Sequence, residues 1–142
     1  MNHAIFTHII RREAPASILH EDELCMAFMD IRPINPGHLL VVPKVYVKLA
    51  IDLPEATVGH LMVIGTRLNR ALRATDLRCE AVNYLLCDGE AAWMEVYHAH
   101  LHIIPRYRGD GHRWHYGPGR PGEPSRAELD AQAAQIRAAM PG

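Results

Sequence analysis

The chain has 142 residues, of which 49% are hydrophobic, so it is long and apolar enough for one domain with a buried core. A formal net charge of −1 at pH 7 argues against a general nucleic-acid-binding protein. The sequence has no recognisable signal peptide and no long apolar run, and its three cysteines lack Cys-x-x-Cys spacing. We therefore expect a cytoplasmic protein with reduced thiols, without a disulfide framework and without a membrane span.

The first half of the chain predicts three short strands. After an N-terminal segment over residues 1–15, strands are expected at 17–20 and 25–29, joined by an acidic turn at 21–23. A continuous apolar run at 39–42, closed by a proline, predicts a buried strand. These three strands precede the first long helix.

The sequence indicates where this helix begins. Asp52 and Glu55 have the spacing of a capping box, which predicts a helix with Asp52 as the N-cap that continues to about Ala74. Its apolar residues recur at helical spacing and are Leu61, Ile64, Leu68 and Leu72. Such a stripe is typical of a helix that packs against the core of a domain.

The second half predicts two further strands and a terminal helix. The strands are expected at 81–87 and 95–104, and a loop rich in Gly and Pro follows over 109–124. A second capping box, Ser125 with Glu128, opens the terminal helix. Five strands combined with helices predict an α+β fold.

The most informative feature is a row of alternating histidines, His98, His100 and His102. Alternate side chains of a strand share a face, so the three imidazoles lie on one face and Leu101 and Ile103 on the other, buried face. Imidazole is the side chain whose ordinary pKa lies nearest to neutral pH. The row can therefore supply a nucleophile, a general acid or base, and donors to phosphate oxygens.

Metal binding is the main alternative, because histidine is the commonest metal ligand. At about 3.3 Å per residue, the Cα atoms of His98 and His102 are about 13 Å apart. Zinc holds each ring nitrogen at about 2.0–2.1 Å. A straight strand therefore does not bring all three rings to one ion, whereas two of them with a distant third ligand are an open alternative.

The histidine row resembles the signature of the histidine-triad family, His-φ-His-φ-His-φ-φ with φ apolar. Three further blocks, 28–33, 36–44 and 89–92, are similar to family blocks and occur in the family order. The chain looks most like the small bacterial members, which are similar to purine nucleoside phosphoramidases.

This resemblance implies a five-stranded antiparallel sheet with one long helix packed on it, a C-terminal helix, and a homodimer with an extended sheet. We expect a histidine-triad domain over residues 1–110. The Gly/Pro-rich loop and the terminal helix, residues 111–142, are expected to be part of the same domain.

The resemblance also implies roles for individual residues. His100 would be the nucleophile, which attacks the α-phosphorus of a nucleotide and forms a nucleotidyl-histidine that water hydrolyses. His98 and His102 flank it, and His102 and His38 would lie beside the phosphate. Asp30 would accept hydrogen bonds from the ribose hydroxyls. The alternatives are an ordinary strand-edge histidine for His38 and a turn aspartate for Asp30.

Further implied contacts concern the base and the leaving group. Phe6, Phe28 and Ile31 would line an apolar slot for the purine, although plain core packing fits Phe6 nearly as well. Cys87 stands where the family usually has Asn or Gln, and Glu95 where the phosphoramidase branch commonly has Ser or Thr. These departures affect the choice of substrate more than the reaction.

Many bacterial relatives bind structural zinc through two cysteines near the N-terminus, a histidine after Pro-Lys and a further histidine. Here Ala4, Thr7 and Tyr46 occupy the first three of those positions, so we expect no metal site there, and no other metal or cofactor. A basic and aromatic cluster after the triad, at 106–115, is either a contact to phosphate or base or a solvated surface.

The leading hypothesis is an enzyme that hydrolyses the α-phosphate linkage of nucleoside phosphoramidates or related nucleotide conjugates and releases a nucleoside monophosphate. The expected partners are a purine nucleotide and a second copy of the chain, with no nucleic acid and no membrane. Two alternatives are a dinucleoside polyphosphate hydrolase or phosphorylase and a nucleotide-binding module of low turnover.

Overall fold

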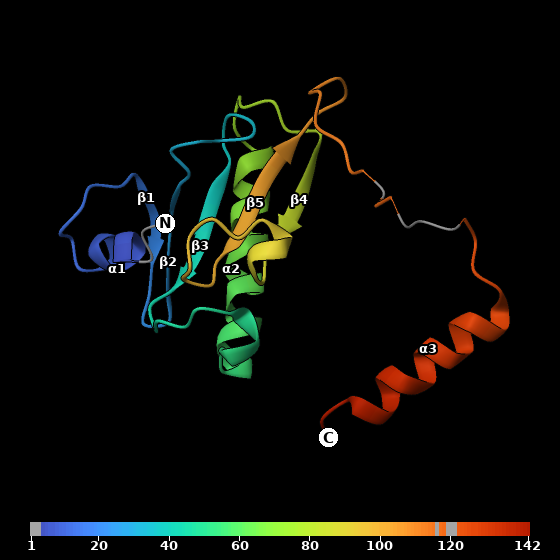
Figure 1. Ribbon diagram of the computed structural model, residues 1–142. Coiled ribbons are helices and arrows are strands. Elements are labelled where there is room, and N and C mark those ends of the chain that lie inside the picture. The colour runs from blue at the N-terminus through green and yellow to red at the C-terminus, as the bar shows by residue number, and fades with distance from the viewer. Residues whose placement is uncertain (1–3, 116, 119–121) are drawn as a thin grey trace. The chain divides into compact units, whose positions relative to one another are not determined.

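The computed structural model describes residues 4–115, 117–118 and 122–142 (Figure 1). They form two compact units, which divide between His112 and Arg113. The first unit holds the sheet and every predicted site residue, and the second holds the terminal helix. The expectation that both units belong to one domain stays a prediction.

The five strands of the first unit form one antiparallel sheet, as predicted (Figure 1). They are β1 (Ile18–Glu21), β2 (Cys25–Met29), β3 (Leu39–Pro43), β4 (Ala81–Leu85) and β5 (Leu101–Arg106). Their order in the sheet is β1-β2-β3-β5-β4. The strand with the last triad histidine, β5, is therefore an inner strand held by a neighbour on each side.

The helix α2 (Glu55–Arg73) covers one face of this sheet, and its apolar stripe forms the larger core. Leu61 and Ile64 are buried in one cluster with Leu101 and Ile103 of β5. The helix approaches the sheet closely at Gly65, where an added Cβ would lie 3.0 Å from Cδ1 of Ile103. The predicted core face of both segments is therefore confirmed.

The start of α2 differs from the prediction. Asp52 is not the N-cap but ends a short 3-10 turn, η1 (Ala50–Asp52), and Pro54 is the N-cap without any side-chain cap. A proline disfavours the helical conformation of the residue before it, and Leu53 is indeed extended, with a ψ of 143°. The helix therefore begins after Pro54, and the spacing of Asp52 and Glu55 is not a capping box.

The other face of the sheet carries a short helix, α1 (Ala4–Ile10), which the residue pattern did not predict. Its buried residues, Phe6 and Ile9, join a second core cluster. The members of this cluster are Phe6, Ile9, Met26, Phe28, Leu40 and Val42. A helix of seven residues is marginal by itself, so these contacts with β2 and β3 stabilise it.

The triad strand is shorter than predicted. β5 begins at Leu101, so His102 lies on it while the other two triad histidines precede it. The residues before β5 are held by the connection between β3 and α2, because the N–H of Ala99 donates to the carbonyl oxygen of Val47 at 2.9 Å. The alternation of faces still holds, since Ala99, Leu101 and Ile103 all belong to the core under α2.

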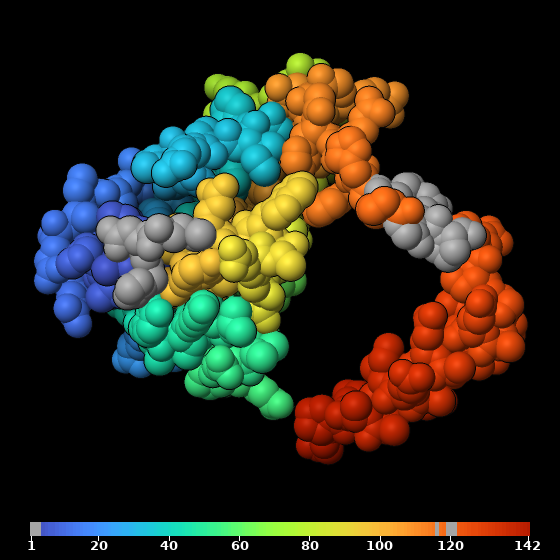
Figure 2. Space-filling view, viewed as in Figure 1, coloured from blue at the N-terminus to red at the C-terminus, as the bar shows by residue number. Residues whose placement is uncertain are grey.

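The neighbouring strand β4 is also shorter than predicted and ends at Leu85. A short 3-10 turn, η2 (Glu90–Ala92), follows and ends at Trp93, which has a positive φ of 65°. The segment around it, yellow in Figure 2, lies on the surface of the molecule, and the Trp93 side chain is 84% exposed.

The second unit contains the helix α3 (Arg126–Ala139), which begins with the predicted capping box. The Ser125 hydroxyl accepts the N–H of Glu128, and the Glu128 carboxylate accepts the N–H of Ser125 at 2.7 Å. Within the described part of the chain, no helix combines the length and the hydropathy that crossing a bilayer requires.

Replacement of Ile64 by alanine should lower the free energy of unfolding by about 2–5 kcal/mol, because it leaves a cavity between α2 and β5. Ile64 is 1% exposed, whereas the adjacent Val63 is 47% exposed on the same helix. The Val63→Ala control should cost no more than about 0.5 kcal/mol. Urea denaturation measures both, and equal losses would contradict the orientation of α2.

Candidate active site

The first two triad histidines are held by backbone carbonyl groups. His98 donates from Nε2 to the carbonyl oxygen of Pro43 at 2.8 Å, and His100 donates from Nδ1 to the carbonyl oxygen of His98 at 2.7 Å. Because Nδ1 of a neutral His100 carries the proton, its Nε2 carries the lone pair. The structure thus gives His100 the tautomer that a nucleophilic imidazole needs.

A second chain of hydrogen bonds fixes His38 and His102. Nδ1 of His38 accepts the N–H of Ile34 at 3.0 Å, so its Nε2 carries the proton. This Nε2–H points to Nδ1 of His102 at 2.9 Å and lies 3.4 Å from Oδ2 of Asp30. His102 therefore accepts at Nδ1 and, as a neutral ring, keeps a proton on Nε2 that it can donate.

Burial keeps all four rings neutral near pH 7. It lowers the pKa of His38, His98 and His100 below the ordinary value of histidine. Burial lowers the pKa of His102 further, to about 3, and the neighbouring His100 and His38 act in the same direction. The cluster is therefore a set of uncharged donors and acceptors.

The rings form a continuous group on the face of the sheet away from α2. The ring centroids of His100 and His102 are 4.7 Å apart, and those of His38 and His102 are 5.1 Å apart. Phe6 packs its ring against His100, with the centroids 5.0 Å apart and the rings nearly perpendicular. Asp30 completes the group, with Oδ2 4.0 Å from Nδ1 of His102.

The three residues expected to line a purine slot do not share one environment. Phe6 and Phe28 are 5% and 2% exposed and pack edge to face in the core, whereas Ile31 is 89% exposed. Phe6 and Phe28 thus pack in the second core cluster, and a role of either ring in holding a base stays a prediction. Ile31 follows Asp30 directly, and its place in a purine slot stays a prediction.

Cys87 and Glu95, expected near the leaving group, lie close to each other in space. Burial raises the pKa of the Cys87 thiol, and the negative charge of Glu95 raises it further. The thiol is therefore protonated at neutral pH, and Glu95 itself is exposed. Cys87 therefore places an uncharged thiol at this position.

The basic cluster after the triad, interpreted above as either a ligand contact or a solvated surface, contains one residue with a structural role, Arg106. Arg106 forms a bidentate ion pair with Asp110, at 2.6 and 2.9 Å, so it is not a free phosphate ligand. Asp110 also accepts the side-chain amide of Asn35 at 2.9 Å. This network ties the loop after β5 to the turn that presents Ile34 to His38, and its contact between Asn35 and Asp110 joins residues too distant in sequence for a pattern to reveal.

The whole triad does not form a potential metal site, because among the described residues neither His98 nor His100 belongs to a group of three close potential ligands. Among the described residues, two groups bring three potential ligand atoms within 4.8 Å of one another. One is Asp30, His38 and His102, within the site described above. The other lies outside it and contains His20 of β1, Asp22 and Cys25 of β2.

Fold and site together define an α+β protein with a group of neutral imidazoles beside the middle strands of an open antiparallel sheet. The sequence matches the HIT domain over residues 11–109, and the chain belongs to the HIT domain family. This is the histidine-triad family, so the predicted membership is confirmed.

Similar proteins support this assignment. An uncharacterized HIT-like protein of Mycobacterium tuberculosis is 42% identical over 106 residues, 75% of this chain and 73% of that protein. The adenylylsulfatase HINT3 of Arabidopsis thaliana is 33% identical over 110 residues, 77% of this chain and 55% of that protein. The crystal structure of a HIT family protein from Bacillus anthracis has 30% identity, covers 96% of both chains and has a TM-score of 0.86. The predicted fold is thus confirmed, and the family includes an enzyme.

Proposed function

We propose that the protein is a nucleotide hydrolase that cleaves the bond between the α-phosphorus of a nucleoside phosphoramidate, or a related conjugate, and its leaving group. The observation that carries this proposal is the 2.7 Å hydrogen bond from Nδ1 of His100 to the carbonyl oxygen of His98. It places an unprotonated nitrogen on a neutral, buried ring, which is the state required of a nucleophile.

The reaction would proceed in two displacements. Nε2 of His100 forms a bond to the α-phosphorus while the bond to the leaving group breaks and the leaving group departs with the electron pair. Water then attacks the nucleotidyl-histidine, the phosphorus–nitrogen bond breaks, and the nucleoside monophosphate is released. His102 would donate from Nε2 to a phosphate oxygen as negative charge develops there.

The remaining site residues support this arrangement. His38 fixes the tautomer of His102 through the 2.9 Å hydrogen bond, and Asp30 would receive the ribose hydroxyls at the open end of the group. His98 supplies the carbonyl that orients the nucleophile. The homodimer, the purine preference and the cytoplasmic location stay predictions.

A direct test is AMP release, measured by chromatography, from adenosine phosphoramidate, lysyl-AMP, adenylyl sulfate, diadenosine triphosphate and diadenosine tetraphosphate. Adenylyl sulfate belongs in the panel because a relative is an adenylylsulfatase. Release from the phosphoramidates would support the proposal, and a preference for a dinucleotide would favour the polyphosphate alternative. Tight AMP binding without any release would favour a nucleotide-binding module.

Asp30→Ala should weaken the binding of AMP about tenfold or more and of its 2′,3′-dideoxy analogue much less, because only the ribonucleotide loses hydrogen bonds to the carboxylate. The Asp30 side chain is 17% exposed, so a ligand can reach it. Calorimetric titration of both nucleotides into both proteins measures the difference. Equal losses for the two nucleotides would remove Asp30 from the ribose role.

A further inference from the structure

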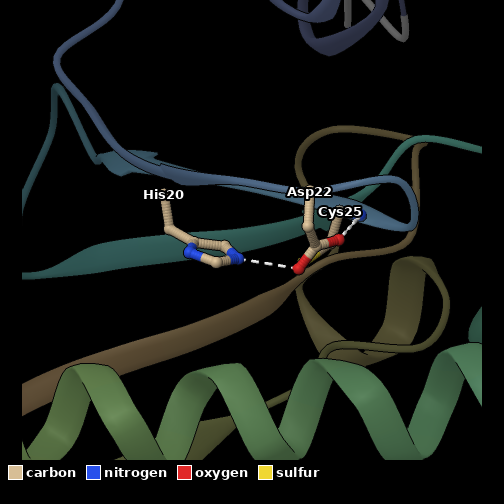
Figure 3. Close-up of side chains that lie close together, drawn as sticks. All are labelled: His20, Asp22 and Cys25. Carbon is tan, nitrogen blue, oxygen red and sulfur yellow. Dashed lines mark hydrogen bonds and ion pairs between the residues drawn. The ribbon is translucent and has the colours of Figure 1, made fainter.

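A second group of potential ligands lies at the other end of β2 from the candidate active site. It contains His20 of β1, Asp22 of the following turn and Cys25, the first residue of β2 (Figure 3). Their ligand atoms are all within 4.8 Å of one another. Cys25 and Asp30 are five residues apart on an extended strand, which places the two groups about 16 Å apart.

A fourth side chain reaches this group from the helix α2. Nε2 of His60 lies 2.7 Å from Oδ2 of Asp22, the same oxygen that lies 2.7 Å from Nε2 of His20. Sγ of Cys25 lies 3.7 Å from this oxygen. Two imidazoles and a thiol from three different elements therefore converge on a single carboxylate oxygen.

The turn itself holds the carboxylate in place. Oδ1 of Asp22 accepts the backbone N–H groups of Leu24 and Cys25 at 2.8 and 2.9 Å, so Oδ2 alone faces the other side chains. Cys25 is fully buried, whereas the side chains of His20 and His60 are 32% and 27% exposed. The backbone thus fixes the carboxylate and burial confines the thiol, whereas the two partly exposed rings can turn toward an ion that enters from solvent.

The donor set matches a particular class of ion. Imidazole, thiolate and carboxylate are the ligands of Zn²⁺, whereas Mg²⁺ and Ca²⁺ take oxygen ligands. In a tetrahedral site with bonds of about 2.0–2.3 Å, neighbouring ligand atoms are about 3.3–3.8 Å apart. The side chains need only small adjustments to reach this spacing. On binding, the ion would replace the protons that the two rings share with Asp22 and the proton of the Cys25 thiol.

We propose that His20, Asp22, Cys25 and His60 bind one zinc-class divalent cation that joins the turn between β1 and β2 to α2. The site differs from the family zinc positions, which are Ala4, Thr7 and Tyr46 in this chain. It lies on the face of the sheet that α2 covers, whereas the triad imidazoles lie on the opposite face. Four protein ligands leave no open position, so the ion has a structural role that does not depend on the proposed function.

The test uses the full chain without a histidine tag, reduced and freed of metal by a chelator, and titrated with Co²⁺. We expect one Co²⁺ per chain with a thiolate-to-cobalt charge-transfer band, which Zn²⁺ removes by displacement. Zn²⁺ at about 100 times its Kd should raise the Tm by about 5–10 °C. The band reports a thiolate ligand and cannot come from Asp30, His38 and His102.

Variants locate the ion. His60→Gln and His20→Gln should each weaken Co²⁺ binding at least about tenfold, and Cys25→Ser should abolish the band. The two histidine variants test the proposal even if Cys25→Ser, a change at a fully buried position, fails to fold. His8→Gln, which breaks an exposed pair with Glu13 at 2.6 Å, and Cys79→Ser are the matched controls and should leave binding unchanged.

Three results would overturn the proposal. One is the absence of a charge-transfer band in the wild-type chain at saturating Co²⁺. Another is a Co²⁺ affinity, measured from the charge-transfer band, that is the same in the His20 and His60 variants as in the wild type. The third is Co²⁺ that binds without a charge-transfer band and is displaced by AMP. That result would place the ion at Asp30, His38 and His102.

Discussion

Replacement of His100 by glutamine should reduce turnover by at least about 10⁴-fold while nucleotide affinity stays within about threefold of wild type. Glutamine keeps a donor that can reach the carbonyl oxygen of His98, but its amide nitrogen has no lone pair available for attack on phosphorus. The loss therefore falls on kcat and leaves the ground-state contacts of the phosphate and ribose in place.

The measurement is AMP release in single-turnover and steady-state conditions, with AMP affinity measured alongside. Acid-quenched wild-type protein should also carry a nucleotidyl adduct, located by mass spectrometry on the peptide that contains His100. His8→Gln is the control for a histidine change in the same unit and should retain full turnover. Turnover or an adduct that survives in His100→Gln would rule out His100 as the nucleophile.

Replacement of His102 by alanine should lower kcat by about 10²–10³-fold, the effect of removing one donor from a developing phosphate charge. Nε2 of His102 carries its proton only because Nδ1 accepts from Nε2 of His38 at 2.9 Å. His38→Ala removes this partner and should also lower kcat, by a smaller factor. Since both changes act on one donor, the double variant should be little worse than His102→Ala.

The experiment is a double-mutant cycle on kcat for the best substrate of the panel, with Tm values to show that each variant is folded. Additive effects would mean that His38 acts independently of His102, and unchanged kcat in His102→Ala would remove it from the reaction. Rescue of His38→Ala activity by His38→Gln, which can donate to His102, would identify His38 as a positioning residue.

The residue pattern was sufficient to predict which side chains of the triad segment lie on each face of the sheet. The apolar residues between the histidines, Leu101 and Ile103, pack under α2, and the imidazoles lie on the other face, because alternation on an extended segment has only two outcomes. The apolar stripe of α2 and the capping box at Ser125 were equally local signals, and both were confirmed. The family followed from the order of the blocks around the triad.

Other features were not evident from the residue pattern. The helix α1 forms because Phe6 and Ile9 pack in one core cluster with Met26 and Phe28. The sequence of these seven residues does not indicate that packing. Arg106 resembles a free cation in the sequence, whereas in the structure it forms an ion pair with Asp110. Asp52 fits a capping box until the extended conformation of Leu53 before Pro54 is taken into account.

The sequence by itself therefore determined the family, the five strands and the long helices, and which face of the sheet the histidines occupy. Only the tertiary structure decided the proton positions on those rings, because Pro43, Ile34 and the carbonyl group of His98 supply the hydrogen bonds that select each tautomer. It also brought His60 to Asp22, 38 residues away, to form the proposed cation site. Alternation and helical spacing are local properties of the backbone, whereas tautomers and ligand sets require contacts that folding alone creates.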